Sequence, residues 1–523
     1  MARSLGRPRR VLGVENIQDA LTRAGYTVAA VNDRIGPAGE LALGRNSTVA
    51  ADRALGPATD PLAVLIRLFL LQQPQPRADV AAALPLDEAI DAGLVSDADP
   101  VTARVDVRPH GSDDGTSGWI VADLTCGLDT PPPPMTEDYV LGISPASTQL
   151  TQLTIPGPVG RVLDLGSGCG VQAVHLAGRA DQVVATDLNA RANELAALTF
   201  ALNQLTVDQR LGSLYEPVAG ERFDLIVTNP PYVMAPPGEA RLTYREGSLA
   251  GDGLCEHLVR ASADHLTDGG TLQILGNWAI HDPDRWTDRL TDWVPAGCDA
   301  LIVERERLDP YEYIEIWLTD AGLAGTAEYL PRYRAWLDYF ETLGIQQVGM
   351  GWINVRRSGT DQPRIRVESW PHAIQQPVGP AIAEWFDAVQ TLREVDTWQQ
   401  HWQIADGVLE ETLGEPGAAD PNHIVLRQYR GLRRAIEADT ALAAVLGACD
   451  GELTLRQIVT AVAGLLEVDA DALTVDLNER LIEAIETGFL VLQAESGSPD
   501  TAGVDSGSAG SGGADTGSAG FGS

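Results

Sequence analysis

The feature that most constrains the fold is a glycine-rich turn between a predicted strand and a predicted helix. Residues 162–178 read VLDLGSGCGVQAVHLAG: an apolar strand ends at Asp164, and the glycines that follow are Gly166, Gly168 and Gly170. Glycines at alternate positions permit a tight turn and leave the backbone bare, so a ligand can lie directly against it. The segment therefore predicts a ligand-binding loop at the carboxyl end of a buried strand.

A second predicted strand ends in an acidic residue shortly afterwards. Residues 183–187 (VVATD) end at Asp187, which lies 17 residues beyond Gly170. A carboxylate there can accept hydrogen bonds from both ribose hydroxyls of a nucleoside. The glycines follow GxGxG and not the GxGxxG of dinucleotide sites, which lowers the expectation of NAD and favours S-adenosylmethionine. Asp164 would then lie near the ammonium end of that ligand.

The sequence NPPY follows the next predicted strand along the chain. Residues 223–233 read FDLIVTNPPYV, and the turn consists of Asn229, Pro230, Pro231 and Tyr232. The prolines fix this turn and remove two backbone donors, which leaves the Asn229 side-chain oxygen and the Pro230 carbonyl as acceptors for one NH2 group. Such a group would have its lone pair directed at an electrophilic methyl group. Tyr232 offers a flat face for a planar amide or base.

Alternating strands and helices surround these motifs and predict a parallel α/β sheet. The helices include residues 190–203 and 252–266, and residues 309–343 form a helical insert before the last strand. The strands are expected at residues 160–165, 182–187, 223–228, 271–276, 300–305 and 348–355.

Changes in composition divide the chain into five segments. The run TPPPP at 130–134 predicts a stiff linker, and the last 29 residues are too poor in apolar side chains to fold. Residues 451–490 read as a small helical module with one apolar stripe. The predicted segments are a disordered arm (1–10), an N-terminal helical, winged-helix-like domain (11–130), a central α/β domain (136–375), a mostly helical C-terminal domain (376–494) and a disordered Gly/Ser/Asp tail (495–523).

The composition argues against several classes of protein. The chain has 523 residues, of which 37 are Lys or Arg and 73 are Asp or Glu, and its net charge is −36. This acidity repels polyanions at long range and so favours a protein target over bare nucleic acid. No apolar run approaches the roughly 20 residues of a membrane span, so we expect no membrane partner. The five cysteines have neither a CxxC pair nor zinc-ligand spacing, which predicts no metal site and a cytoplasmic location.

Together, the glycine turn, the acid of the second strand and the NPPY run resemble the class I S-adenosylmethionine-dependent methyltransferases. They are most similar to the release-factor glutamine methyltransferase group and to relatives with a methyltransferase small domain. The resemblance covers roughly residues 141–356 and implies a Rossmann-like core of seven strands. It implies cofactor contacts from Asp164, Gly166, Gly168, Gly170 and Asp187, and contacts to the target nitrogen from the catalytic residues Asn229, Pro230 and Tyr232.

The resemblance also implies cofactor contacts from Thr148 and Ser213, in two segments that match the family pattern only in part. Residues 143–148 (ISPAST) lie where the family has a PR-x-x-T segment beside the cofactor, with Ser144 in place of the arginine and Thr148 at the threonine. Ser213 stands where the family often has an acid that contacts the adenine amine. Residues 251–254 (GDGL) resemble the family's turn after the catalytic loop.

Three hypotheses for the function follow. The first is methylation of a glutamine side chain in a protein, such as a translation release factor. The alternative is methylation of an exocyclic amino group of adenine or guanine in RNA or DNA, and the third is a non-catalytic scaffold. An arginine stripe within VLRQYRGLRR (residues 425–434) could contact RNA or an acidic partner, or could form ion pairs within the chain.

Overall fold

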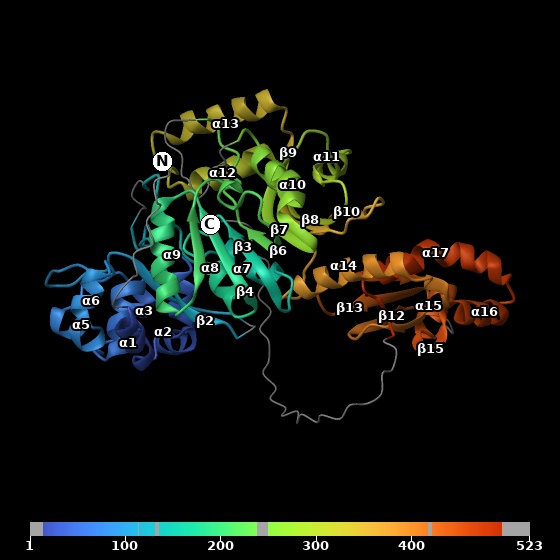
Figure 1. The fold of residues 1–523 in the computed structure, drawn as a ribbon, viewed down its shortest axis with the longest axis horizontal. Coiled ribbons are helices and arrows are strands. Elements are labelled where there is room, and N and C mark those ends of the chain that lie inside the picture. Colours follow the sequence, from blue (N-terminus) through green and yellow to red (C-terminus); the bar gives the residue numbers. More distant parts are fainter. Residues whose placement is uncertain (1–13, 113–114, 131–134, 238–248, 417–420, 494–523) are drawn as a thin grey trace. The chain divides into compact units, whose positions relative to one another are not determined.

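The computed structural model describes five stretches of the chain, residues 14–112, 115–130, 135–237, 249–416 and 421–493 (Figure 1). They form two compact units. The first contains the described residues up to 151 together with 157–370, and the second contains residues 152–156 and those from 371 onward. The predicted arm at 1–10 and the predicted tail at 495–523 lie outside the described residues.

The first unit is built around a sheet of eight strands in the order β10-β8-β9-β7-β6-β3-β4-β5. All neighbouring pairs are parallel except those of β9, which runs antiparallel to both β7 and β8. The strands are β3 (Val159–Leu165), β4 (Ala180–Asp187), β5 (Val207–Leu211), β6 (Phe223–Thr228), β7 (Leu266–Ile280), β8 (Cys298–Leu308), β9 (Gln347–Arg357) and β10 (Ile365–Ser369).

This sheet confirms the predicted α/β core and adds two strands to the six expected ranges. β5 and β10 were not predicted, because both are five residues long and mix charged with apolar side chains. The chain runs outward from β3 through β4 to β5 and then returns to β6 on the other side of β3. Ligands of open α/β sheets bind at such a reversal, beside the carboxyl ends of the strands.

Among the described residues, seven α-helices and one 3-10 turn (η2, Glu216–Val218) accompany this sheet. They include the predicted insert, which consists of two helices, and the helices predicted at 190–203 and 252–266. Their bounds are α7 (Pro145–Leu153), α8 (Val171–Ala177), α9 (Ala190–Leu202), α10 (Gly253–His265), α11 (Trp286–Trp293), α12 (Pro310–Asp320) and α13 (Tyr329–Leu343).

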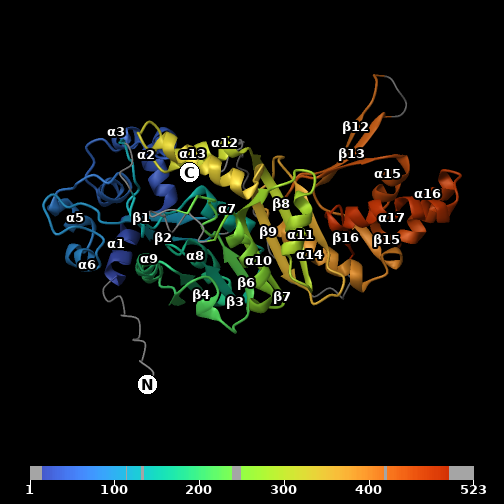
Figure 2. The ribbon, with the colours of Figure 1, turned by 90° about the horizontal axis from the view of Figure 1, so that it is seen from above.

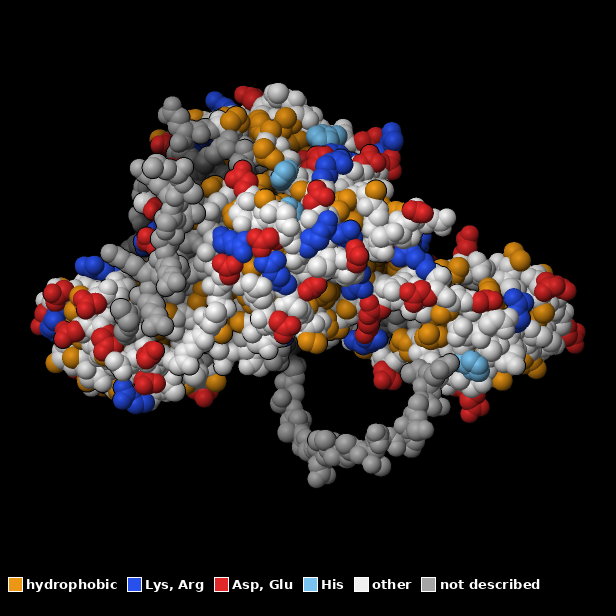
Figure 3. Space-filling view, in the orientation of Figure 1, with side chains coloured by type: hydrophobic (Ala, Val, Ile, Leu, Met, Phe, Trp, Pro, Cys, Tyr) orange, Lys and Arg blue, Asp and Glu red, His pale blue; other side chains and the backbone are white. Residues whose placement is uncertain are grey.

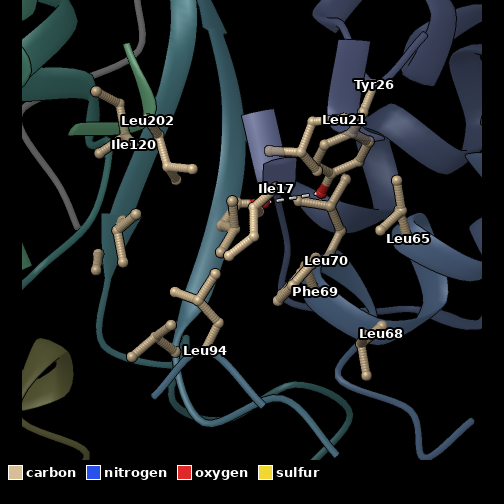
Figure 4. Close-up of a cluster of buried hydrophobic side chains, with 14 of the residues drawn as sticks. Ile17, Leu21, Tyr26, Leu65, Leu68, Phe69, Leu70, Leu94, Ile120 and Leu202 are labelled. Atoms are coloured by element: carbon tan, nitrogen blue, oxygen red, sulfur yellow. Dashed lines mark hydrogen bonds between the residues drawn. The ribbon is translucent and has the colours of Figure 1, made fainter. Parts of the chain in front are cut away.

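The N-terminal part of the first unit is helical, as predicted, and it ends in an antiparallel hairpin. Figure 4 shows its core, in which the buried Tyr26 hydroxyl donates a hydrogen bond to the Val107 carbonyl, 2.8 Å away. The hairpin lies against α9, where the Val121 amide donates to Thr199 Oγ1 at 2.9 Å. The elements are α1 (Glu15–Arg23), α2 (Val28–Leu43), α3 (Val49–Leu55), α4 (Pro61–Leu65) with the π-helical turn η1 (Ile66–Leu70), α5 (Arg77–Ala83), α6 (Leu86–Asp91), β1 (Asp106–Gly111) and β2 (Ser117–Ala122).

The described residues of the second unit form four α-helices, one 3-10 turn (η3, Thr397–Gln399) and two three-stranded sheets. Figure 2 shows β12 and β13 as a projecting hairpin. The predicted module at 451–490 is present, and its apolar stripe, from Leu455 to Val462 on α16, is buried. The short strands outside that module were not predicted. The elements are α14 (Gly379–Glu394), β11 (His401–Ile404), β12 (Val408–Leu413), β13 (His423–Gln428), β14 (Ala435–Ala438), α15 (Thr440–Gly447), β15 (Asp450–Thr454), α16 (Leu455–Leu465), α17 (Ala470–Glu486) and β16 (Leu490–Leu492).

Many of the arginines form ion pairs with acidic residues, which outnumber the basic residues 73 to 37. On the face in Figure 3, arginines and acidic residues are interspersed. In the stripe at 425–434, Arg427 pairs with Glu411 at 2.9 Å and Arg430 pairs with Glu384, so two of its arginines form ion pairs within the chain. None of the described helices has the length and apolarity needed to cross a membrane. The five cysteines are free thiols, and no group of metal-ligating side chains occurs among the described residues.

Candidate active site

A cavity of about 320 Å³ lies at the carboxyl ends of β3, β4 and β6, where the direction of the chain through the sheet reverses. It lies entirely within the first unit. Of the ten residues predicted for the site, the seven that line this cavity are Asp164, Gly166, Gly168, Asp187, Ser213, Asn229 and Pro230.

The glycine turn after β3 leaves bare backbone at the wall of the cavity. Gly166 and Gly168 have φ angles of +73° and +53°, in the left-handed region that favours glycine. A Cβ atom added at either position would meet no other atom within 4 Å. The amides of Gly166 and Ser167 both donate to the Thr186 carbonyl, at 2.8 and 2.9 Å, which ties the turn to the end of β4.

Asp187, at the end of β4, is oriented by the backbone around it. One carboxylate oxygen accepts from the Gly168 amide at 2.8 Å and the other from the Asn189 amide at 2.7 Å. Burial raises the pKa of this carboxyl above its ordinary value. Each carboxylate oxygen has two lone pairs, so both can accept one further hydrogen bond, as two ribose hydroxyls would require.

Asp164, at the end of β3, is only 2% exposed. One of its oxygens accepts from the Ala173 amide of α8 at 3.0 Å. Burial raises the pKa of this carboxyl to about 7. A ligand ammonium group beside it would favour the charged form, because an opposite charge compensates for the lost hydration.

Asn229 carries an unsatisfied acceptor at the end of β6. Its Oδ1 atom is buried and receives no hydrogen bond from the described residues. The strand end that holds it is tied to β3, because Thr228 Oγ1 donates to the Leu165 carbonyl at 2.7 Å. Leaving a buried acceptor unpaired costs about 1–3 kcal/mol, so this oxygen is suited to an external N–H donor.

The structure does not bring Tyr232, Gly170 and Thr148 to the cavity wall. The Tyr232 ring packs edge-on against Trp317 of α12, with 6.2 Å between the ring centroids. Burial raises the pKa of its phenol well above the ordinary value, so the ring stays neutral.

Gly170 and Thr148 occupy helix positions that face elsewhere. Gly170 precedes α8, and a Cβ there would come within 2.6 Å of the Phe200 ring of α9. Thr148 is exposed on α7, whereas Ser144 and Ser147 from the same segment line the cavity. Successive residues of a helix point about 100° apart, so Ser147 can face the cavity when Thr148 does not.

Several residues of the wall were not predicted from the sequence. Ser167 Oγ and Thr186 Oγ1 line the cavity and are buried without a hydrogen-bond partner among the described residues. Leu188 also lines it and is 59% exposed, which gives an apolar surface next to Asp187. Its position directly after the acid was the available signal. The unpaired hydroxyls, the apolar surface and the two carboxylates together fit a ligand with a nucleoside part and a charged amino-acid part.

The fold and the site together define a class of protein. Seven of the strands, from β3 to β9, form a Rossmann-like sheet with a single antiparallel strand. The glycine turn, Asp187 and the first three residues of the NPPY turn line the cavity at its reversal point. This is the architecture of a class I methyltransferase domain, for which S-adenosylmethionine is the cofactor.

Comparison with protein families supports this class for the central part of the chain. Residues 145–291 match the family model described as "Methyltransferase small domain". The match confirms the predicted methyltransferase class and its cofactor, S-adenosylmethionine. Residues 23–106 match a second model, described as "Domain of unknown function (DUF7059)".

Among curated proteins, the chain is similar to two named "Ribosomal RNA small subunit methyltransferase C". It is 30% identical to that of Erwinia tasmaniensis over 203 residues, which is 38% of this chain and 52% of the relative. It is 32% identical to that of Salmonella arizonae over 138 residues, or 26% and 36% of the two chains. The chain thus spans about half the length, or less, of these relatives.

A solved structure titled as the T. thermophilus 16S rRNA N2 G1207 methyltransferase with AdoMet and guanosine is also similar. The match has 20% identity and a TM-score of 0.25, and it covers 35% of this chain and 44% of the other.

Proposed function

We propose that this protein transfers a methyl group from S-adenosylmethionine to an exocyclic amino nitrogen of guanine or adenine in RNA. The observation that carries the proposal is the buried, unpaired Oδ1 of Asn229 beside a cavity suited to the cofactor. This oxygen accepts one N–H of the target, and the Pro230 carbonyl accepts the other. We also propose that the protein acts in the cytoplasm, where an RNA substrate is present.

RNA is favoured over a protein substrate by the relatives alone. An amide NH2 and a base NH2 present the same two donors, so Asn229 does not distinguish between them. The curated relatives are named as ribosomal RNA methyltransferases. The hypothesis of glutamine methylation in a release factor receives no support from these comparisons, and we therefore propose its RNA alternative.

The chain's own residues supply orientation for this reaction. The cofactor, when bound, supplies an electrophilic methyl group. Asp187 and the bare turn at Gly166 and Gly168 hold the nucleoside part, and Asp164 lies in the same cavity for the ammonium group. With both N–H bonds of the target directed at Asn229 and Pro230, the nitrogen lone pair faces the methyl. After transfer, the extra proton on nitrogen leaves to solvent, so no strong base is needed, and positioning supplies most of the rate enhancement.

A labelling experiment tests the substrate class. The full-length protein is incubated with S-adenosylmethionine carrying a radiolabelled methyl group and a lysate of a strain that lacks the protein. Half of the sample is then treated with nuclease and half with protease. We expect the label in large molecules to be lost with ribonuclease and kept with protease. Label that survives nuclease but not protease would restore the glutamine hypothesis, and a failure to bind S-adenosylmethionine would favour the scaffold.

Replacing the unpaired acceptor tests the site itself. Asn229→Ala should lower kcat about 100-fold or more, because the target nitrogen loses its orienting acceptor, a loss comparable with that of an oxyanion-hole group. Calorimetry should show S-adenosylmethionine affinity within about twofold of the wild type. Asn422→Ala, at an exposed position in the second unit, is the matched control and should behave as wild type. Wild-type turnover by Asn229→Ala would show that the catalytic assignment is wrong.

A further inference from the structure

The helical insert formed by α12 and α13, drawn in yellow in Figure 1, packs directly against the NPPY turn. Val233 and Met234, which follow that turn, are 2% and 1% exposed and belong to one buried cluster with side chains of both helices. The insert thus shares a hydrophobic core with the end of the proposed catalytic loop.

One side chain of the insert joins this loop to the sheet. The Tyr313 hydroxyl oxygen, on fully buried Tyr313, accepts from the Met234 amide at 3.0 Å and from Asn277 Nδ2 of β7 at 2.8 Å. A phenol oxygen has two lone pairs, so these two bonds use its full accepting capacity. The hydroxyl therefore fixes the backbone at Met234 relative to β7.

Neighbouring contacts reinforce this arrangement. Trp317 lies one helical turn beyond Tyr313 on α12 and packs edge-on against Tyr232, so a single helix face holds both Tyr232 and Met234. On α13, the Tyr339 hydroxyl accepts from the Gly251 amide at 3.0 Å.

The short loop that carries Asn229 is consequently fixed at both ends. At its start, Thr228 is paired with Ile274 in the sheet and bonded to the Leu165 carbonyl. At its far end, Met234 is held by Tyr313. Two prolines between these anchors restrict the backbone further. The unpaired Oδ1 of Asn229 lies between two fixed points.

From this geometry we infer that Tyr313 is a positioning residue: its hydroxyl sets the placement of Asn229 and Pro230 relative to the cofactor without touching substrate or cofactor. The inference rests on the proposed function for its catalytic consequence. A misplacement of about 1 Å can cost roughly 100-fold in rate, whereas the residues that line the cofactor cavity do not include Tyr313.

The test is Tyr313→Phe, which removes one oxygen atom and keeps the ring in the core. The matched control is Tyr333→Phe, also in the insert, where the Tyr333 hydroxyl donates an exposed hydrogen bond to Glu315 at 3.0 Å. Because a merely structural role would lower only the amount of folded protein, kcat is expressed per S-adenosylmethionine site counted by calorimetry. We expect Tyr313→Phe to lower kcat about 10- to 100-fold with cofactor Kd within about twofold, and Tyr333→Phe to match wild type.

Hydrogen exchange on the cofactor-free protein provides a second readout that needs no activity. Peptides covering residues 229–237 contain four prolines, so the Met234 amide is one of few that exchange. Faster exchange there in Tyr313→Phe, and not in Tyr333→Phe, supports the inference. Unchanged exchange overturns it, as does wild-type kcat in Tyr313→Phe. If the wild type methylates no RNA, the proposed function fails, and exchange alone decides whether Tyr313 fixes the loop.

Discussion

The two carboxylates of the candidate site end neighbouring parallel strands but have different surroundings. Asp187 is held by two backbone amides, whereas Asp164 receives one and is almost completely buried. The raised pKa of about 7 at Asp164 follows from burial, which penalises the charged form. At pH 7 the Asp164 carboxyl is therefore present in both its protonated and its charged form, and a bound cation would favour the charged form.

This environment gives Asp164 a signature in the pH dependence of stability. Between pH 4 and pH 7 the folded protein keeps a proton that the unfolded chain loses, so the contribution of Asp164 to stability falls as pH rises and is constant above pH 7. Asp164→Asn cannot titrate. From pH 5 to pH 8, its free energy of unfolding should gain about 2–3 kcal/mol relative to wild type, at about 1.4 kcal/mol per pKa unit.

The measurement uses the unfolding transition that S-adenosylmethionine shifts to higher temperature, since ligand binding identifies the domain that contains the cavity. Groups that do not interact with Asp164 titrate equally in both proteins and cancel in the difference. Parallel pH profiles for the two proteins would contradict the raised pKa.

At the scale of elements, the turn between β3 and α8 serves two purposes that its sequence does not separate. Gly166 and Gly168 face the cavity, whereas Gly170 allows α9 to approach, since a Cβ at that position would come within 2.6 Å of Phe200. Its φ of +85° independently disfavours any side chain. One glycine pattern thus encodes both ligand access and helix packing.

Alanine substitutions at the two ends of α8 test the packing role of Gly170. Gly170→Ala should destabilise the first unit by about 1–3 kcal/mol, from the strained backbone and the clash with Phe200. Gly178→Ala is the matched control, because Gly178 ends the same helix with a φ of −73° and open space around its Cβ position. Chemical denaturation measures both. Equal stability of the two variants would show that the contact with Phe200 is not tight.

At the scale of the whole molecule, the N-terminal part of the first unit, as far as the structure describes it, supports the wall of the cavity without lining it. The segment of residues 137–142 lines the cavity at several positions. It is held by Asp123, which follows the hairpin, accepts from the Val140 amide at 2.8 Å and forms a two-oxygen ion pair with Arg191 of α9. Asn189 adds a bond to the Asp138 carbonyl at 2.8 Å.

Breaking this link should weaken cofactor binding from outside the cavity. Asp123→Ala removes the acceptor of the Val140 amide and of Arg191. If about 1 kcal/mol of cofactor-binding free energy is lost with these bonds, Kd rises roughly fivefold. Asp97→Ala, which removes an exposed ion pair with Arg77 in the same N-terminal part, is the control. Calorimetry with S-adenosylmethionine measures both variants. Unchanged affinity in Asp123→Ala would separate the N-terminal part from the cofactor site.

The sequence by itself determined the features that depend on local chemistry. Alternating glycines after a β-branched strand favour a small set of tight turns. The prolines after Asn229 restrict the backbone locally, whatever tertiary contacts the chain makes. The six predicted strands and the buried stripe on α16 follow from periodicity, because burial of one face selects the spacing of apolar residues. The insert at 309–343 was predicted as a single helical segment, and its division into α12 and α13 was not predicted. The seven predicted site residues that line the cavity all lie at strand ends or in the turns that follow them.

Only the tertiary structure decided what depends on contacts between distant segments. It rotated Thr148 away while Ser147 faces the cavity, placed Phe200 against Gly170, and turned Tyr232 towards Trp317, 85 positions further along the chain. It also bonded the Met234 amide to the Tyr313 hydroxyl and lined one part of the cavity with residues 137–142, which Asp123 holds in place. Helix rotation, close approach and hydrogen bonding between remote elements have no local sequence period, and so they appear only when the elements pack together.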